Sequence, residues 1–348
     1  MKKIAFIDRD GTIILEPQDT KQVNGLEQLE FLSNAISSLK RLQDNEFELI
    51  IVSNQDGLGT QTNPKDNYDL INSKIIQILD SEGIKISKWL TCPHFEKNNC
   101  NCRKPKTGLI DFEFDKDKSV MIGDRETDIQ FAKNLQIKGF KITDDFKWKE
   151  IVNEILSRKA TIKRKTKETD IKVNLKIDGD GKANINTGLK FLDHMLQQIA
   201  KHGNFDLEID CKGDLEIDEH HTIEDIAICL GEAYKICLDN KRGIARFASQ
   251  KIVPLDEAIS FVSLDISGRP FCKFDAKFER EYCGDLPTEM ISHFFQSFAT
   301  SSNITLHIKI EGENTHHKIE SCFKAFAKCL YDASRVSGNN IISTKGVL

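Results

Sequence analysis

The sequence contains no apolar run approaching the roughly 20 residues that a helix needs to cross a bilayer. It also lacks a large excess of charge of either sign, because 49 basic and 54 acidic side chains leave a net charge of only -5. No strong electrostatic field therefore points to a nucleic acid or a membrane surface as a partner. The 348 residues are enough for two ordinary domains.

A secretion signal is missing as well. The apolar run at residues 4–7 follows two lysines but ends at Asp8, short of the roughly 7 to 15 apolar residues of a signal peptide. We interpret this run as a buried first strand. Ten cysteines without such a signal predict reduced thiols and a cytoplasmic location.

A five-residue phrase, in contrast, occurs twice. It reads H-H-T-I-E at residues 220–224 and H-H-K-I-E at residues 316–320. Each copy follows a strand-like stretch and begins an apolar-periodic helix, where a His and a Glu three or four positions apart share one face. This spacing places an imidazole and a carboxylate within reach of one divalent ion. Two such phrases in equivalent settings are a far more specific pattern than one.

The repeat extends upstream of each phrase. Residues 192–200 and 291–299 share apolar residues at helical spacing and one His off the apolar stripe. Because the copies are offset by about 100 residues, the chain from about residue 165 onward predicts two copies of one unit. The alternative, ordinary surface or core histidines, does not explain the duplicated spacing, so we predict a dinuclear metal site. Its candidate ligands are His194, His220, His221, Glu224, His293, His316, His317 and Glu320.

In the first half of the chain, polar residues follow three predicted strands. The strands are residues 3–7, 47–52 and 119–122, and the polar residues after them are Asp8, Asp10, Ser53 and Asp124. Strands that alternate with helical patterns indicate a doubly wound parallel α/β sheet. Such sheets bind ligands in the crevice at the carboxyl ends of their strands, where these side chains are expected.

A cluster of potential zinc ligands falls within eleven residues, and its members are Cys92, His94, Cys100 and Cys102. Three Cys and one His are the composition of a closed tetrahedral Zn²⁺ site, and because no fifth ligand is near, we expect its role to be structural. Such a site would staple a loop and position the neighbouring Lys104. Unliganded thiols and a disulfide are the alternatives, and a cytoplasmic setting disfavours the disulfide.

The motifs of the first half resemble those of the haloacid dehalogenase phosphohydrolases. The resemblance rests on D-x-D-G-T after the first strand, a Ser after the second, a Lys before the last helix and a G-D-x-x-x-D phrase. It implies that Asp8 is the nucleophile, which becomes an aspartyl phosphate, and that Asp10 is the general acid/base. It also implies that Ser53 and Lys104 bind the phosphoryl oxygens, with Lys106 as the competing candidate for the lysine.

The same resemblance implies a Mg²⁺ cofactor. A carboxylate attacks phosphorus only when the charge of the phosphoryl group is neutralised. The ion would be held by the Asp8 side chain, the Asp10 backbone carbonyl and Asp124. The zinc loop is found in the histidinol-phosphatase and heptose-bisphosphate phosphatase branch of these enzymes. Short connections without a large cap domain favour a small phosphorylated metabolite as the substrate.

A run of basic residues separates the two halves. Residues 159–167 hold five basic side chains and almost no apolar ones, as a solvated linker or an exposed strand does, and strand alternation follows. We therefore predict a domain boundary near residue 160, with domains of residues 1–160 and 161–348.

The second domain closely resembles the imidazoleglycerol-phosphate dehydratase family over nearly its whole length. The phrases that carry the resemblance are residues 164–169, 191–195, 220–225, 267–270, 293–295, 316–320 and 343–346. It implies a duplicated α/β fold with sheets backed by helices, in a large homo-oligomer built from trimers whose active sites form between subunits. Histidine and carboxylate ligands without a thiol suit Mn²⁺, and the family binds two Mn²⁺ per site through the eight ligands named above.

The resemblance also assigns roles outside the metal ligands. Glu168 lies at the position of the family's general acid/base; the alternative is an exposed glutamate on a strand. Arg246, Arg269 and Lys345 are candidates for binding a phosphate dianion, and Lys201 is a weaker one. The implied substrates are small phosphorylated imidazoles.

Both resemblances point to histidine biosynthesis. Together they predict a bifunctional enzyme with histidinol-phosphatase activity in the first domain and imidazoleglycerol-phosphate dehydratase activity in the second. One alternative keeps the dehydratase but makes the first domain a heptose-bisphosphate phosphatase, although fusion to a dehydratase counts against it. Another is a metal-storage or assembly module without turnover, against which the intact D-x-D phrase and Glu168 argue.

Overall fold

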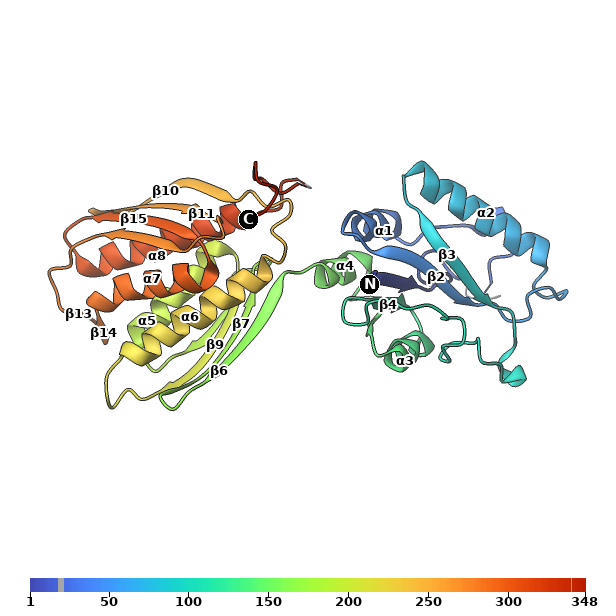
Figure 1. Ribbon diagram of the computed structural model, residues 1–348. Helices are drawn as coiled ribbons and strands as arrows, with labels where there is room; N and C mark the ends of the chain where they lie inside the picture. The colour runs from blue at the N-terminus through green and yellow to red at the C-terminus, as the bar shows by residue number, and fades with distance from the viewer. Residues whose placement is uncertain (18–21, 339) are drawn as a thin grey trace. The chain divides into compact units, whose positions relative to one another are not determined.

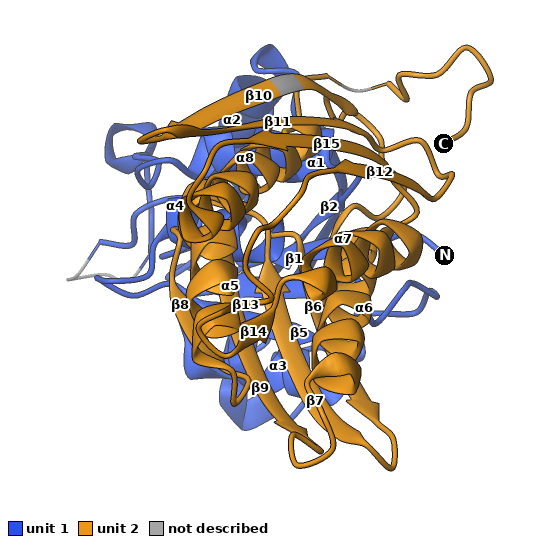
Figure 2. Cartoon of the chain, turned by 90° about the vertical axis from the view of Figure 1, so that its left-hand side faces the viewer, with its two compact units in different colours: residues 1–156 blue, residues 157–348 orange. Residues whose placement is uncertain are grey.

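The computed structural model describes residues 1–17, 22–338 and 340–348 and divides into two compact units, Met1–Leu156 and Ser157–Leu348 (Figure 2). The sequence predicts a boundary near residue 160, and the division falls after Leu156, at the end of helix α4 (Trp148–Ile155). No helix among the described residues is long and apolar enough to cross a membrane.

Unit 1 is built on a five-stranded parallel sheet with the strand order β3-β2-β1-β4-β5 (Figure 1). Its strands are β1 (Ile4–Ile7), β2 (Glu48–Asn54), β3 (Ile86–Cys92), β4 (Val120–Gly123) and β5 (Lys138–Lys141). Its other helices are α1 (Ala35–Asp44), α2 (Lys65–Ser81), α3 (Glu126–Leu135) and the short η1 (Leu26–Gln28) and η2 (Glu96–Asn98). The chain runs outward from β1 to β3 and then through β4 to β5 on the other side. This confirms the predicted doubly wound fold.

Strand β1 lies at the centre of the sheet, and its four residues are all buried, as expected of a strand covered on both faces. Ala5 and Ile7 pack into a core with residues of α1, α2 and α4, while Ile4 and Phe6 pack with Phe131 of α3. The strand order reverses between β1 and β4. In open α/β sheets this switch point is where the crevice for ligands forms.

Unit 2 contains two four-stranded sheets with four helices between them (Figures 1 and 2). The first sheet, in the order β6-β7-β9-β8, consists of β6 (Lys159–Lys165), β7 (Thr169–Lys176), β8 (Ala183–Asn186) and β9 (Asp206–Gly213). The second, in the order β10-β11-β15-β12, consists of β10 (Phe247–Leu255), β11 (Ala258–Asp265), β12 (Phe271–Asp275) and β15 (Thr305–Glu311). The helices are α5 (Lys190–Gly203), α6 (His220–Cys237), α7 (Glu289–Ser302) and α8 (Thr315–Ser334). A small hairpin is formed by β13 (Tyr282–Cys283) and β14 (Leu286–Pro287).

The two sheets have the same connections. In each, the first two strands form an antiparallel hairpin, and the second strand pairs antiparallel with the strand before the long helix. That third strand pairs in parallel with the remaining one, β8 or β12. Helix α5 thus corresponds to α7 and α6 to α8, which confirms the predicted internal duplication.

The basic run of residues 159–167 lies near the start of unit 2 and contains all of β6. Burial alternates along this edge strand, so Ala160 and Ile162 pack against the core while Lys163 and Lys165 face solvent. Lysines on an edge strand discourage pairing with another chain. The run is therefore an exposed strand rather than a linker.

Candidate active sites and metal centres

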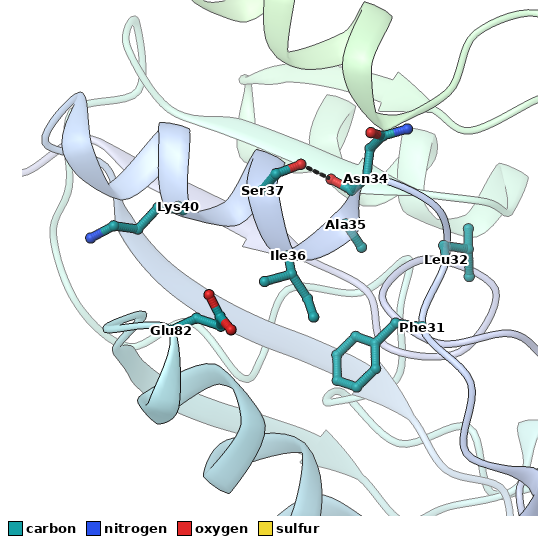
Figure 3. Close-up of a pocket in the computed structure, with 8 residues that line it drawn as sticks. All are labelled: Phe31, Leu32, Asn34, Ala35, Ile36, Ser37, Lys40 and Glu82. Atoms are coloured by element: carbon teal, nitrogen blue, oxygen red, sulfur yellow. Dashed lines mark hydrogen bonds between the residues drawn. The ribbon is translucent and has the colours of Figure 1, made fainter.

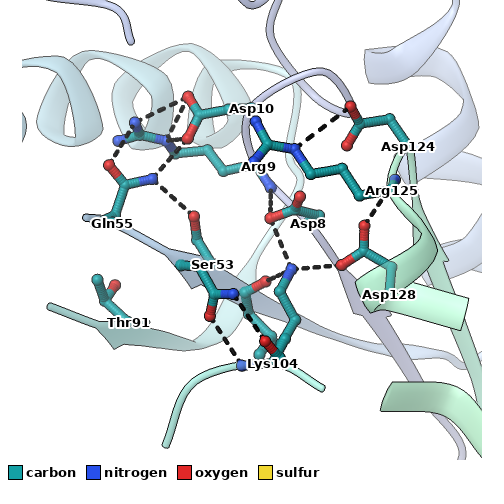
Figure 4. A network of polar contacts seen from close by, with 12 residues as sticks. Asp8, Arg9, Asp10, Ser53, Gln55, Thr91, Lys104, Asp124, Arg125 and Asp128 are labelled. Atoms are coloured by element: carbon teal, nitrogen blue, oxygen red, sulfur yellow. Dashed lines mark hydrogen bonds and ion pairs between the residues drawn. The ribbon is translucent and has the colours of Figure 1, made fainter. Parts of the chain in front are cut away.

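The carboxyl ends of β1, β2 and β4 bring Asp8, Ser53 and Asp124 together (Figure 4), at the edge of the sheet where the ligand crevice of such folds is expected. The backbone N–H of Asp8 donates to the Ile122 carbonyl at 2.9 Å, which ties the end of β1 to β4. Asp8 and Ser53 are almost fully buried, with 6% and 1% exposure. Three predicted residues from distant parts of the sequence thus share one largely buried site.

Lys104 reaches into this crevice from a loop. Its Nζ lies 2.9 Å from Asp8 Oδ1 and 2.6 Å from Asp128 Oδ1. Lys106, the competing candidate, is exposed and donates to the Asn99 side chain at 2.6 Å. The structure places Lys104, and not Lys106, beside the predicted nucleophile.

Three carboxylates crowd this crevice. Oxygens of Asp8, Asp124 and Asp128 lie within 4.8 Å of one another. Burial raises the pKa of Asp8 to about 6, although Lys104 opposes this, and burial together with the charge of Asp8 raises the pKa of Asp124. Asp124 Oδ1 is buried without a hydrogen-bond partner among the described residues. Gly11 turns the chain beside it with φ of 70°, and a Cβ there would collide with the Asp124 carboxylate. This oxygen-only donor set fits a Mg²⁺ ion.

Asp10 is held by two side chains that the sequence did not single out. Arg9, which is 1% exposed, donates to both carboxylate oxygens of Asp10 at 2.9 to 3.1 Å. The Gln55 amide donates to Asp10 Oδ2 at 2.6 Å and to Ser53 Oγ at 2.8 Å. The predicted acid/base is therefore linked through Gln55 to the predicted phosphoryl-binding serine.

Signals for these missed residues were present in the sequence. Asp128 is the last member of the G-D-x-x-x-D phrase and lies in the first turn of α3. Arg9 stands between the two acids of D-x-D. Gln55 follows Ser53 by two positions, and residues two apart along an extended chain share one face.

The four predicted zinc ligands lie together. The Sγ atoms of Cys92, Cys100 and Cys102 are 3.3 to 3.6 Å apart. Nδ1 of His94 lies 3.2 Å from Cys102 Sγ and 3.7 Å from Cys92 Sγ. Ligands about 2.3 Å from a tetrahedral Zn²⁺ are separated by roughly 3.8 Å, so this spacing fits the ion. Burial acts against ionisation, yet hydrogen bonds with Cys102 and Cys92 lower the pKa of the Cys100 thiol to about 6.

This cysteine loop is fastened to the end of β2. The backbone N–H of Gln55 donates to the Cys92 carbonyl at 2.8 Å. The backbone N–H of Lys104 donates to Asn54 Oδ1 at 2.9 Å, and the Asn54 amide donates back to the Lys104 carbonyl at 3.1 Å. Because only one residue separates Cys102 from Lys104, the cluster holds the backbone that presents the Lys104 ammonium.

In unit 2, six of the eight predicted ligands form two groups of three, in each of which the donor atoms lie within 4.8 Å of one another. The groups are His194, His316 and Glu320, and His220, Glu224 and His293. His316 Nε2 lies 3.0 Å from Glu320, and His293 Nε2 lies 3.3 Å from Glu224. His293 Nε2 is buried and makes no hydrogen bond of good geometry among the described residues. These mixed nitrogen and oxygen donors fit an ion such as Mn²⁺.

Each group takes its members from both copies of the repeat. Helix α5 supplies His194 to the pair carried by α8, and α7 supplies His293 to the pair carried by α6. The helices pack in these same combinations, α5 against α8 and α6 against α7. The repeat predicts the ligand types, but not this exchange between copies.

The second histidine of each H-H pair lies outside the two groups, because consecutive helical residues point about 100° apart. Nδ1 of His221 is 3.1 Å from Asp214, and its Nε2 is 3.9 Å from Glu168. Nδ1 of His317 is 2.9 Å from Glu257. A hydrogen bond with Asp214 raises the pKa of His221, and one with Glu257 raises the pKa of His317. Glu168 itself stands in the turn between β6 and β7, with 52% of its side chain exposed.

The predicted phosphate ligands lie at one end of the second sheet. The Arg246 guanidinium donates to Asp265 at 2.8 and 3.2 Å and to the Ile342 carbonyl at 2.6 Å. The carboxyl-terminal segment that carries Lys345 is thereby tied to Arg246. Arg269 lies in the connection between β11 and β12, at this same end of the sheet, and Lys345 is exposed. Their contacts among the described residues do not include a histidine of either group.

A cation that the sequence did not single out lies closer to a metal group. Lys324 stands one turn after Glu320 on α8, and its Nζ is 2.8 Å from Glu320 Oε1. Burial and the charge of Lys324 lower the pKa of the nearby His202, and Lys201 adds to this effect. Lys324 has no counterpart in the first copy, since the equivalent position on α6 is the apolar Ile228.

Two surface pockets lie away from all these residues. One, of about 540 Å³, is lined by Phe31, Ile36, Lys40 and Glu82 among others, beside the start of α1 (Figure 3). The other, of about 370 Å³, is in unit 2 next to Arg158. Neither contains a predicted site residue, so side-chain chemistry rather than cavity volume locates the candidate sites.

Comparisons with known proteins agree with this division into two sites. The family described as imidazoleglycerol-phosphate dehydratase matches residues 187–330, and the family described as polynucleotide kinase 3 phosphatase matches residues 3–147. The chain is 48% identical to a Campylobacter jejuni subsp. jejuni protein named histidine biosynthesis bifunctional protein HisB, across 100% of this chain and 99% of that protein. It is 45% identical to the protein of the same name from Legionella pneumophila subsp. pneumophila, across 100% of both. A crystal structure of imidazoleglycerol-phosphate dehydratase from Staphylococcus aureus is 32% identical, covers 52% of this chain and 99% of its own, and has a TM-score of 0.47.

Proposed function

Because this chain belongs to the family of bifunctional histidine-biosynthesis proteins, we propose that unit 1 hydrolyses histidinol phosphate and that unit 2 dehydrates imidazoleglycerol phosphate to imidazole-acetol phosphate. The buried contact between Asp8 and Lys104 at the end of β1 carries the first assignment. The two histidine–glutamate groups, each built from both copies, carry the second.

In unit 1, the Asp8 carboxylate attacks phosphorus and the bond from phosphorus to the histidinol oxygen breaks, while Asp10 gives that oxygen a proton. Asp10 then takes a proton from water, the water oxygen attacks phosphorus, and the bond to Asp8 breaks to release phosphate. Lys104 and Ser53 bind the phosphoryl oxygens in both steps. Asp8, Asp124 and the Asp10 carbonyl would hold Mg²⁺, which supplies positive charge against the phosphoryl group.

The surrounding residues position this machinery. Arg9 and Gln55 fix the orientation of the Asp10 carboxylate through hydrogen bonds of 2.6 to 3.1 Å. The four ligands of the cysteine loop would hold a structural Zn²⁺. That loop keeps the Lys104 backbone against Asn54, so the ammonium stays beside Asp8.

In unit 2, the net reaction removes the hydroxyl from the carbon next to the imidazole and a proton from the following carbon. The hydroxyl leaves with a proton as water, and the resulting enol gains a proton at the first carbon and loses its O–H proton to give the ketone. We assign proton transfer to Glu168, whose exposed carboxylate lies beside His221. The histidine–glutamate groups would hold two Mn²⁺ ions, which supply Lewis acidity to the substrate. Arg246, Arg269 and Lys345 are assigned to the phosphate, and we add Lys324 because it lies beside one group.

We further propose a homo-oligomer built from trimers. Each group offers three protein donors, whereas Mn²⁺ favours octahedral coordination. His221 and His317 lie outside the groups of their own chain, and about a third of each side chain is exposed. In the assembly they would complete the ligand sets of neighbouring chains. Sedimentation of the purified protein with and without Mn²⁺ tests this arrangement.

The first test of function is phosphate release with Mg²⁺ from histidinol phosphate and from a heptose bisphosphate, together with dehydration of imidazoleglycerol phosphate with Mn²⁺. Preference for histidinol phosphate supports the assignment of unit 1. Preference for the heptose would reassign unit 1 and leave unit 2 unaffected. A protein that binds metal but turns over neither substrate would instead be a storage or assembly module.

A further inference from the structure

The two histidines outside the metal groups are each held by a carboxylate, and the two copies of the repeat supply that carboxylate from different places. We propose that Asp214 and Glu257 are positioning residues, which orient His221 and His317 so that each presents Nε2 to a metal ion. This inference rests on the proposed metal-dependent dehydration and names two residues that the ligand pattern does not contain.

In the first copy, the carboxylate comes from the residue directly after β9. Asp214 lies 3.1 Å from Nδ1 of His221, and its backbone N–H donates to the Glu168 carbonyl at 3.0 Å. An Nδ1–H that donates to a carboxylate leaves the Nε2 lone pair available, as in the carboxylate–histidine pairs that orient metal ligands. Asp214 also ties His221 to the turn that carries Glu168, the assigned acid/base.

In the second copy, the carboxylate comes from a hairpin. Glu257 directly precedes β11, as Glu168 directly precedes β7. Its Oε2 lies 2.9 Å from Nδ1 of His317, and its Oε1 accepts from the backbone N–H of Asn314 at 2.7 Å. Asn314 is the N-cap of α8, so Glu257 holds both the start of the helix and the imidazole. Because both carboxylate oxygens of Glu257 have partners, its side chain is less free to move than that of the exposed Glu168.

The two carboxylates are not counterparts in the repeat. The buried residues Leu207, Ile209 and Cys211 of β9 match Leu306, Ile308 and Ile310 of β15, so Gly213 matches Gly312 and Asp214 matches Glu313. The carboxylate at Nδ1 of His317 nevertheless comes from Glu257, in the neighbouring hairpin one residue before β11.

Both copies reach the same geometry at Nδ1 by these separate routes. On the Nε2 side, each imidazole faces an exposed turn carboxylate at a longer distance, 3.9 Å to Glu168 and 3.7 Å to Asp256. An incidental surface ion pair would not be expected to involve Nδ1 of the second histidine in both copies. The repeated contact, made by residues that are not equivalent in sequence, is what identifies a positioning role.

The test measures the binding of Mn²⁺ to the full-length chain. The electron paramagnetic resonance signal of free Mn²⁺ reports how much of the ion remains unbound. The variants are Asp214→Asn, Asp214→Ala and Glu257→Gln. Glu216→Gln and Glu313→Gln are matched controls, because both are exposed acids near the same two helix starts. The melting temperature of each metal-free variant is measured alongside.

We expect Asp214→Asn and Glu257→Gln each to weaken the binding of one of the two Mn²⁺ ions by roughly 10- to 100-fold. Asp214→Ala should give an effect at the upper end of this range. The metal-free melting temperatures and the control variants should match the wild type. Affinities equal to those of the controls would overturn the inference, as would a loss of binding that parallels a fall in the metal-free melting temperature. A wild-type chain that binds no Mn²⁺ would instead contradict the proposed function of unit 2.

Discussion

The candidate site of unit 1 lies at the carboxyl ends of strands, whereas the candidate site of unit 2 lies near the amino-terminal ends of helices. Unit 1 uses the carboxyl ends of parallel strands, where Asp8 and Lys104 are nearly buried and neutralise each other. Unit 2 uses the beginnings of helices, where His194 and His220 keep 42% and 47% of their side chains exposed. The first site is closed around its own charges, whereas the second leaves His194 and His220 partly exposed. The first arrangement suits the small phosphate monoester proposed as its substrate, and the second would suit the proposed site shared between chains.

The largest expected effect separates the two units by activity. Asp8→Asn removes the nucleophile, since an amide does not attack phosphorus, and should lower phosphate release by at least about a thousandfold. Dehydration should be unchanged. Lys106→Ala is the control, because this lysine lies outside the crevice. Loss of both activities in Asp8→Asn would show that the units are coupled and would break the comparison.

A second variant makes the reciprocal separation. His194→Ala removes the one donor that α5 contributes to the group with His316 and Glu320. The variant should bind closer to one Mn²⁺ ion per chain than to two. Dehydration should fall by about a hundredfold or more while phosphate release stays constant. Elemental analysis of the purified protein measures the metal. His202→Ala, on the same helix but outside the group, is the control. Retention of both ions would remove His194 from the ligand set.

The cysteine loop offers a smaller effect, confined to unit 1. Cys100→Ser should release Zn²⁺, lower the unit's melting temperature by several degrees and reduce phosphate release several-fold through Lys104. Both tryptophans, Trp89 and Trp148, lie in unit 1, so their fluorescence follows this unit alone. Cys272→Ser in β12 is the control. Unchanged zinc content and melting temperature would exclude Cys100 as a ligand.

The smallest effect concerns the stability of unit 2. Burial opposes ionisation of Asp178, but hydrogen bonds from Arg158 outweigh it and lower the pKa of Asp178 below its usual 3.8. Ionised Asp178 therefore stabilises the fold above pH 4 or so, and this contribution disappears as the pH falls through the lowered pKa. Asp178→Asn should cost about 1 kcal/mol at pH 7, because solvent screens part of the pair.

Urea unfolding followed by circular dichroism measures this cost, with unit 1 monitored separately by tryptophan fluorescence. The gap between wild type and Asp178→Asn should close towards pH 3. A gap of the same size at both pH values would mean that the charge on Asp178 does not contribute.

The sequence predicts most of the first site because each residue is tied to a local element. D-x-D follows a buried strand, and the sheet topology then brings Asp8 and Asp124 together without further information. The choice between Lys104 and Lys106 could not be made this way, since both lie in a loop whose path depends on Asn54 and the cysteine cluster. Arg9 was missed because a cation between two acids has no obvious role until its burial is known.

The second site was predictable in composition but not in pairing. Helical periodicity shows that His220 and Glu224 share a face, and the duplication supplies the same for His316 and Glu320. Which helix-borne histidine joins which pair depends on how the four helices pack, and that is a long-range property of the core. The sequence places His221 in the same predicted ligand set as His220, whereas the structure separates the two, and the carboxylate that holds His221 comes from outside the repeat pattern.

The exchange of histidines between copies makes the two halves of unit 2 interdependent. A chain cut in the connection between α6 and β10 would yield one piece with a lone helix histidine and one H-H-x-x-E, and a second piece with the same. Neither piece would contain a complete three-donor group, because His194 of the first piece belongs to the group on α8 and His293 of the second belongs to the group on α6. Two such fragments, expressed separately, would each lack a complete metal group of unit 2 and would regain it only on reassociation, although the first fragment would keep the whole of unit 1.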